Sequence, residues 1–525
     1  MNLLVRTASL CLLAALLTAP GFAQKPHFKD LDGLAQYFQK NHKAPFDRDS
    51  VRMPPVGAAA IAKGAARATR LNAAVKGTNV KVNQDRNPWP KAEIGSSVDP
   101  LTGKTYVVMS NDFRENWDHM FYHVSTNSGK LWTDDSMVGG ADPATGFVPL
   151  TFQSDPGVAL DGLGHSYLST ITGNSIFDFT SGYENFDTEI EVAEGFGNGT
   201  YTLPLPTPID DQPCNGLLSG TITCNAQLDK PLITVDNVAT SSNNGTVYVY
   251  YTLFCGSTAC TDGSAVAPAF SSVILESHSA GVGLPFSPPA LVSGKLVNTQ
   301  FSSLVVDSHG TPHIFFDDFT HPQIMMYEST LTGSSWVVTP TPVATFSFIN
   351  LGSPNWAFRS SGTVAPGCGI HIDTAYCAFS ANQIAGGKAE GGVSVYVAVV
   401  DTLSGLSAVH RVNNDPFGTG KDHFFPWAAP KSDGSIYVGW YDDRKDPFNT
   451  LVGYWVGKSI DGGSTFATQK QVSDVTFNPC VGFPGCGFFG DYTQLVAGPD
   501  GIVHAAWSDT RDDASMQIYS QSIAW

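Results

Sequence analysis

The chain has 525 residues and a formal net charge of −18, with 52 glycines and only 14% charged residues. Nucleic acids select proteins with concentrated lysine and arginine, so this acidic composition excludes nucleic acid as a partner. It also disfavours anionic polymers as general partners, unless a few arginines gather locally.

The N-terminal residues 1–23 have the pattern of a secretory signal peptide. Arg6 precedes an apolar run over 8–17, and small residues follow before Gln24. This run is too short to span a bilayer, and no later segment reaches about 20 apolar residues, so we expect no membrane span. We therefore predict a secreted protein, extracellular or periplasmic. Residues 24–77 are expected to form an N-terminal extension, partly helical or disordered, with no assigned chemistry.

Residues 78–525 are predicted to be all-β. Short runs of Val, Tyr, Phe, Thr and Ile alternate with Gly, Asp, Asn and Pro turns, and no amphipathic helical stretch appears. A strand, Asp-Gly turn, strand unit recurs with a period of roughly 60 to 75 residues, which suits a four-stranded radial blade. Its turn aspartates are Asp99, Asp161, Asp236, Asp307, Asp433 and Asp500, with a degenerate copy near 367–377. We predict a seven-bladed β-propeller, with six blades as the alternative.

A second signature predicts how the ring closes. The pattern Val-x-x-Asp ends the outer strand at 412–415, and a form one residue shorter occurs at 472–474. The same pattern stands at 80–85, before the first unit begins, while the last unit contains only three strands. We therefore expect the strand near 80–84 to pair with 517–523, which removes two free sheet edges.

The cysteines that follow the signal peptide fall as close neighbours. An oxidising compartment favours four local disulfides from this spacing, whereas a metal site would need Cys-x-x-Cys pairs that the chain lacks. The expected pairs are Cys214 with Cys224, Cys255 with Cys260, Cys368 with Cys377, and Cys480 with Cys486. We expect no cofactor; the Asp-rich loops are compatible with a structural calcium ion, although no EF-hand spacing is present.

A hairpin motif recurs between the third and fourth strands of several units. Residues 459–466 read Ser-x-Asp-x-Gly-x-Thr-Phe, and 125–132 and 329–336 are degenerate copies. The Asp or Asn side chain can accept hydrogen bonds from turn amides, Gly supplies a positive φ, and the aromatic residue packs beneath the next strand. These motifs resemble the Asp-box, or bacterial neuraminidase repeat, family of sialidase-like propellers, over about 80–525. The resemblance implies an active site on the face opposite the boxes.

The resemblance also implies roles for particular residues. In sialidases a tyrosine nucleophile is activated by a carboxylate, an aspartate serves as acid/base, and arginines clamp the substrate carboxylate. The implied catalytic residues are Tyr492, Asp491 and Asp118, and the implied substrate-binding residues are Arg114, Arg444, Arg511 and Trp427. Where family members carry Arg-Ile-Pro before the first strand, this chain has Pro90-Lys91-Ala92-Glu93-Ile94.

Other interpretations of the same residues stay open. Tyr492 also fits an ordinary packing tyrosine, and Asp-x-Arg loops that recur in three units fit ion pairs that brace neighbouring blades. The predicted function is a secreted, sialidase-like propeller that acts on glycans as a hydrolase of terminal anionic sugars. The alternative is a non-catalytic propeller that binds carbohydrate or protein; a lyase of acidic polysaccharide is a weaker third. We expect a monomer whose partner is a carbohydrate or glycoconjugate.

Overall fold

The computed structural model describes residues 79–525 except 115–117, 138–151, 179–182, 197–199, 202–206, 213–224, 264, 322, 348–357, 359–364, 484–485, 487 and 513–514. The predicted signal peptide, the N-terminal extension, and both Cys214 and Cys224 lie outside the described residues. Every element of the described chain is a strand, and no helix among these residues is long and apolar enough to cross a membrane.

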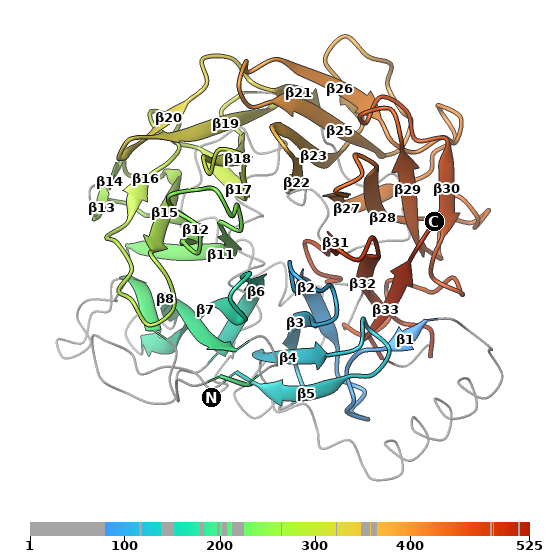
Figure 1. Ribbon diagram of the computed structural model, residues 1–525, viewed down its shortest axis with the longest axis horizontal. Helices are drawn as coiled ribbons and strands as arrows, with labels where there is room; N and C mark the ends of the chain where they lie inside the picture. Colours follow the sequence, from blue (N-terminus) through green and yellow to red (C-terminus); the bar gives the residue numbers. More distant parts are fainter. Residues whose placement is uncertain are drawn as a thin grey trace.

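Seven antiparallel sheets form a ring, with the first strand of each sheet innermost (Figure 1). Blade 1 contains β2 (Lys91–Val98), β3 (Tyr106–Asp112), β4 (His119–Ser125) and β5 (Thr133–Ser136). Blade 2 contains β6 (Phe152–Leu160), β7 (His165–Asp178), β8 (Tyr183–Phe196) and β10 (Thr207–Gln212), with β9 (Thr200–Tyr201) beside β8. Blade 3 contains β11 (Ala226–Val235), β12 (Val247–Cys255), β15 (Ser272–Ser279) and β16 (Ala290–Leu291). A separate hairpin, β13 (Cys260–Asp262) and β14 (Ala265–Ala267), projects from blade 3.

The remaining blades complete the ring. Blade 4 contains β17 (Thr299–Val306), β18 (Pro312–Asp318), β19 (Ile324–Thr332) and β21 (Ala344–Ser347), with β20 (Ser335–Val338) and β24 (Gln383–Ile384) at its outer edge. Blade 5 contains β22 (Gly367–His371), β23 (Thr374–Ala381), β25 (Ser394–Asp401) and β26 (Ser407–Arg411). Blade 6 contains β27 (His423–Pro430), β28 (Ile436–Asp442), β29 (Gly453–Ser459) and β30 (Thr468–Gln471). Blade 7 contains β31 (Leu495–Ala497), β32 (Val503–Asp509), β33 (Gln517–Ile523) and β1 (Val80–Lys81).

The ring closes through the N-terminal strand, as predicted. β1 pairs antiparallel with β33, with Val80 opposite Ser520. The amide N of Val82 donates to the carbonyl oxygen of Ile518 at 2.8 Å, which extends the pairing beyond β1. Figure 1 shows the blue N-terminal strand beside the red C-terminal strands. The seven-bladed prediction is confirmed, and the six-bladed alternative is wrong.

Two of the three predicted hairpin motifs fold alike. In the copy at 459–466, the Ser459 hydroxyl accepts from the Gly463 amide at 2.9 Å, and the Asp461 carboxylate accepts from the Thr465 amide at 2.9 Å. In the copy at 125–132, the Ser125 hydroxyl accepts a hydrogen bond from the Gly129 amide at 2.9 Å. The copy at 329–336 differs because β19 continues through it and turns at Gly333 into β20. The motif therefore shapes hairpins at two places and marks only a turn at the third.

Three of the expected disulfides form: Cys255 with Cys260, Cys368 with Cys377, and Cys480 with Cys486. The Cys368 bridge joins directly opposed residues of β22 and β23. The prediction of near-neighbour pairing is confirmed for these three pairs.

The innermost strands share an irregularity that decides what faces the axis of the ring. In five blades the pairing of the first two strands shifts register, and the residue at the shift has a positive φ between 52° and 55°. A bulge of this kind bends the strand and re-aims one side chain. The five residues are Glu93, Asp155, Lys230, Phe301 and Phe425.

Candidate functional site

Four charged residues from four blades meet at the axis. The Lys230 ammonium lies 3.2 Å from Asp155 Oδ1 and 3.4 Å from Glu93 Oε1, and it also contacts Asp491 Oδ2. These residues come from blades 3, 2, 1 and 7, and side chains from four blades can meet only near the centre of the ring. Lys230 is 6% exposed, and the three carboxylic acids are at most 1% exposed. We call these four residues the axial cluster.

Local sequence explains why these side chains point inward. Asp155 and Lys230 each precede a proline, which has no N–H to continue the strand ladder, and the register shifts there. Asp491 follows Gly490, whose φ is +97°. A Cβ on Gly490 would lie 3.0 Å from the Glu93 amide N, so the glycine lets blade 7 approach blade 1 closely.

The axial cluster contains more carboxyl groups than cations. Burial is the largest influence on Glu93, and together with Asp155 and Asp491 it raises the pKa of this group well above its ordinary value. Burial opposes the charge on Lys230, but the surrounding carboxylates outweigh it and raise the pKa of Lys230. Burial and its acidic neighbours thus favour the neutral form of Glu93, whereas the carboxylates favour the charged form of Lys230. A carboxylic acid held beside a carboxylate can pass a proton in either direction.

Hydrogen bonds extend the axial cluster to Asp118. The Asn111 amide donates to Glu93 Oε2 at 2.7 Å and to the Ser154 hydroxyl at 3.1 Å, and its oxygen accepts from the Asp155 amide at 3.0 Å. Asp118 lies beyond Ser154, is 5% exposed, and has one carboxyl oxygen without a hydrogen bond. Burial raises the pKa of Asp118 well above its usual value, although a hydrogen bond with Ser154 acts against this.

Tyr492 borders the same group. Its hydroxyl donates to the Pro156 carbonyl oxygen at 3.0 Å, and its ring centroid lies 5.6 Å from the Lys230 ammonium. The structure thus brings Tyr492, Asp491 and Asp118 into one network. Glu93, Asp155 and Lys230, which the sequence analysis did not single out, link these three residues.

The three predicted arginines lie elsewhere, one in each of blades 1, 6 and 7. Each binds the aspartate two residues before it and an aspartate that follows the outer strand of the preceding blade. These pairs are Arg114 with Asp112 (2.6 Å) and Asp85 (3.4 Å), Arg444 with Asp442 (2.7 Å) and Asp415 (3.7 Å), and Arg511 with Asp509 (2.6 Å) and Asp474 (2.7 Å). The arginine of each Asp-x-Arg signature therefore binds the aspartate of a Val-x-x-Asp signature on the preceding blade. We call each of these interblade ion pairs a clasp. This geometry favours the bracing interpretation of the Asp-x-Arg loops.

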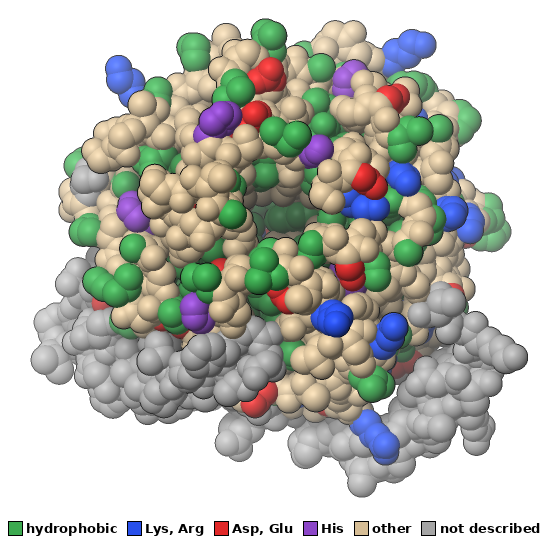
Figure 2. Space-filling model, viewed as in Figure 1, with side chains coloured by type: hydrophobic (Ala, Val, Ile, Leu, Met, Phe, Trp, Pro, Cys, Tyr) green, Lys and Arg blue, Asp and Glu red, His purple; other side chains and the backbone are tan. Residues whose placement is uncertain are grey.

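Aromatic side chains fill another side of the ring centre. The ring centroid of Phe424 lies 5.0 Å from that of Phe425 and 5.7 Å from that of Phe358, and the Phe425 and Phe489 rings stack at 6.5 Å. We call these four phenylalanines the aromatic sector. Trp427 follows Phe424 and Phe425 on β27 and is 8% exposed. Figure 2 shows a hollow at the centre of the face in view, with hydrophobic side chains at its base.

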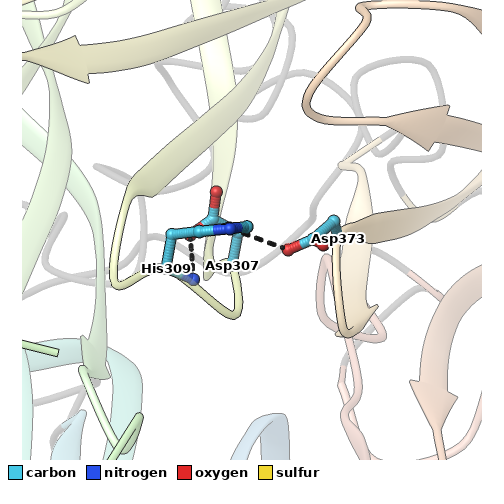
Figure 3. A group of neighbouring side chains, drawn as sticks. All are labelled: Asp307, His309 and Asp373. Carbon is cyan, nitrogen blue, oxygen red and sulfur yellow. Dashed lines mark hydrogen bonds and ion pairs between the residues drawn. The ribbon is translucent and has the colours of Figure 1, made fainter. Parts of the chain in front are cut away.

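One group of described side chains has the donors to hold a metal ion. Asp307, His309 and Asp373 come from the β17–β18 and β22–β23 turns (Figure 3). His309 Nδ1 lies 3.3 Å from Asp373 Oδ1, which also accepts from the Ser308 hydroxyl at 2.7 Å. Asp307 Oδ1 accepts from the amides of His309 and Thr311. These contacts join the β17–β18 turn of blade 4 to the β22–β23 turn of blade 5, so we interpret the group as a structural link between the two blades.

No protein-family model and no curated protein matches this chain. Among solved structures, a leech intramolecular trans-sialidase in complex with 2,7-anhydro-Neu5Ac is 10% identical, with a TM-score of 0.43 over 74% of this chain and 71% of that one. A GH93 α-L-arabinofuranosidase of Fusarium graminearum, in complex with arabinobiose, is 10% identical with a TM-score of 0.39, over 85% and 97% of the two chains. A PL25 ulvan lyase is 10% identical with a TM-score of 0.41, over 84% and 95%. Likenesses this distant transfer no activity to this chain.

Proposed function

We propose that this chain acts on glycans as a glycoside hydrolase, and that the axial cluster with Tyr492 is its reaction centre. The observation that supports the proposal is the contact of Lys230 with three buried carboxyl groups, one of which, Glu93, has a pKa raised well above its ordinary value by burial. Glycoside hydrolysis needs one carboxylic acid to protonate the leaving oxygen and one carboxylate to act as a base or nucleophile. Export from the cell, expected from residues 1–23, would bring the protein to extracellular glycans.

Each residue has a role in this proposal. Glu93 donates the proton, Asp491, which contacts Lys230, accepts one, and Asp118 is a second buried acid. Tyr492 would act as a nucleophile only after its hydroxyl leaves the Pro156 carbonyl and gives its proton to a carboxylate. Lys230 is the most exposed member of the axial cluster, so we place the entry of the sugar at Lys230.

The charge of the site bears on the substrate. The resemblance to sialidases suggests a terminal anionic sugar, which requires a free cation at the site. The predicted arginines are engaged in clasps, and three carboxyl groups already surround Lys230. This charge balance favours an uncharged sugar as a second candidate substrate.

The test is release of a fluorogenic leaving group from an α-sialoside, an α-L-arabinofuranoside and neutral hexosides by the full chain. Glu93→Gln and Tyr492→Phe each remove one reactive group and should lower turnover by roughly 10²- to 10⁴-fold. Tyr106→Phe is the matched control because it also removes one buried tyrosine hydroxyl, and Tyr106 on β3 takes no part in the hydrogen bonds of the axial cluster described above. No turnover on any substrate, with retained binding on a glycan array, would support the binding module instead.

A further inference from the structure

We propose that residues 50–77 of this chain dock on an acidic groove formed by turns of blades 7, 1 and 2. Asp99 lies on the turn between β2 and β3, Asp161 on the turn between β6 and β7, and Asp500 on the turn between β31 and β32. These blades are neighbours in the ring (Figure 1), and a Cβ on Gly103 of blade 1 would lie only 2.5 Å from Asp500 Cγ. The proposal does not rest on the proposed hydrolase activity.

The groove contains a cavity of about 400 Å³ between blades 1 and 2. Asp99 and Leu101 line it from blade 1, and Asp161 and Leu163 line it from blade 2. The two leucines are 68% and 69% exposed, so they leave apolar surface uncovered on both sides of the cavity. We call this cavity, together with the adjoining Asp500 turn, the turn groove.

The three aspartates of the turn groove have no strong cation beside them. Asp99 and Asp500 accept hydrogen bonds from amides of their own turns, at 2.9 and 3.1 Å, which hold the carboxylates without removing their charge. Asp161 contacts His165 at 2.7 Å. In the part of the chain that the structure describes, no lysine or arginine forms an ion pair with any of the three. The exposed Lys104 of the first turn offsets only part of their charge.

The proposed occupant carries the opposite charge. Residues 50–77 contain five lysines and arginines and no acidic residue, whereas residues 78–525 contain 18 lysines and arginines against 43 acidic residues. Opposite charges on two surfaces attract and fix their relative position. Leu71 directly follows Arg70, so the same segment also offers an apolar side chain for the exposed leucines. The segment thus matches the turn groove in both charge and apolar surface.

The segment also begins from the right place. It ends two residues before Asn79 is reached by Val80, and Asn79 donates to the Val472 carbonyl oxygen at 2.8 Å and to Gln521 of β33 at 3.0 Å. The chain therefore leaves the ring beside blade 7. A segment of this length spans roughly 90 Å when extended, while a compact unit of this size has a radius of gyration of about 22 Å, so blades 1 and 2 are within reach. A docked segment would hold the closing blade to its two neighbours.

The experiment joins neighbouring amines and carboxylates with a zero-length carbodiimide, in protein that retains residues 24–77, and identifies the crosslinked peptides by mass spectrometry. We expect Lys63 or Lys76 to be joined to Asp99 or Asp500 at low salt. The yield should fall about fivefold or more in 1 M NaCl, where the Debye length is about 3 Å. Mixing ¹⁵N-labelled and unlabelled protein separates links within one chain from links between two copies. Links only between copies, or no link to these aspartates, would overturn the proposal.

A charge-reversed pair of variants tests the segment. Arg67→Glu with Arg70→Glu keeps both reactive lysines but reverses the charge beside them, so the links within the chain should be lost. Lys40→Glu with Lys43→Glu makes the same change in charge outside residues 50–77 and should leave the links intact. Equal yields from the two double variants would show that overall charge, and not this segment, produces the links, which also overturns the proposal.

A second pair of variants tests the apolar side of the turn groove. Leu101→Ser should lower the yield of the links several-fold and speed hydrogen exchange of the amides of 161–165. Leu403→Ser is the matched control because Leu403 is another exposed leucine, 65% exposed, on a turn of blade 5. If Leu101→Ser behaves like Leu403→Ser in both measurements, the turn groove is not where the segment docks.

Discussion

One member of the axial cluster and one member of the aromatic sector occupy equivalent positions in different blades. Lys230 in blade 3 and Phe425 in blade 6 both stand at a register shift of the innermost strand, with φ values of 55° and 52°, and both precede proline. One of these positions supplies a buried ammonium group, and the other supplies a ring in an apolar wall. The repeated backbone therefore fixes where a side chain lies, while the residue at that place decides its chemistry.

The comparison also limits what backbone strain can indicate. A positive φ in a residue other than glycine is costly and often marks functional sites. Here it recurs in both the charged and the aromatic parts of the ring, so it follows from the bulge. The charges, and not the backbone, distinguish the candidate site.

The largest expected effect comes from removing the single cation of the axial cluster. Lys230→Met leaves Glu93, Asp155 and Asp491 buried without their counter-charge and should lower the free energy of unfolding by about 3–5 kcal/mol. Guanidinium denaturation measures this. Lys431→Met, which removes an ion pair with the 57% exposed Asp433, should cost less than about 1 kcal/mol. Equal effects of the two variants would remove the distinction between the axial cluster and a surface pair.

The aromatic sector should respond through packing alone. Phe489→Ala removes a ring that contacts Phe358 and Phe425 and should cost about 3–4 kcal/mol. The cost should not vary with pH between 5 and 8, since no charge is uncovered. Denaturation at several pH values measures it, with Phe489→Leu as the milder control. If the cost of Phe489→Ala varied strongly with pH, the aromatic sector would influence the charged groups of the axial cluster.

Repeated, local patterns made much of the fold predictable. The turn aspartates, the Val-x-x-Asp signature and the cysteine spacing each gave a correct element, since each depends on residues close in sequence. The misleading copy at 329–336 has the right residues for a turn, but β19 runs through it.

The axial cluster was not predictable in this way because Glu93, Asp155 and Lys230 come from three blades and meet only when the ring forms. A signal was nonetheless present: a proline follows Asp155, Lys230 and Phe425 at the same place in three units. The link between the arginines and the Val-x-x-Asp aspartates also depends on how blades stack. The roles given to Tyr492, Asp491 and Asp118 stay predictions.

The blades with a clasp can be compared with blade 4, in which Thr320 stands at the position of the arginine. Arg444→Ala leaves the Asp442 carboxylate, which is fully buried, without its 2.7 Å ion pair and should cost about 2–3 kcal/mol. In blade 4 the equivalent Asp318 accepts from the amide and the hydroxyl of Thr320, and no ion pair with Asp318 occurs among the described residues. Thr320→Ala should cost about 1 kcal/mol in the same denaturation assay. If both variants cost the same, the arginine adds nothing beyond a hydrogen bond.

The smallest expected effect concerns a buried carboxyl group of blade 6. Burial raises the pKa of Asp443 in blade 6 to about 7, above its ordinary value of 3.8. The folded state then binds more protons than the unfolded state, so stability falls as pH rises from about 4 to 7. Asp443→Asn should add about 1–2 kcal/mol at pH 8 and little at pH 4. Thermal unfolding at both pH values measures this, and the reverse order would contradict the assignment.

The closing strand has a consequence for biosynthesis. The Asn83 side chain donates to Gln517 at 2.7 Å, across 434 residues of chain. Because the ribosome delivers β33 last, β1 must wait without its partner until nearly all of the ring has been made. Six blades can assemble in order from local contacts, but the seventh joins the earliest and latest parts of the chain, and contacts so distant in sequence form slowly. Until that step the nascent ring has an open seam, where a helper that shields strand edges would act.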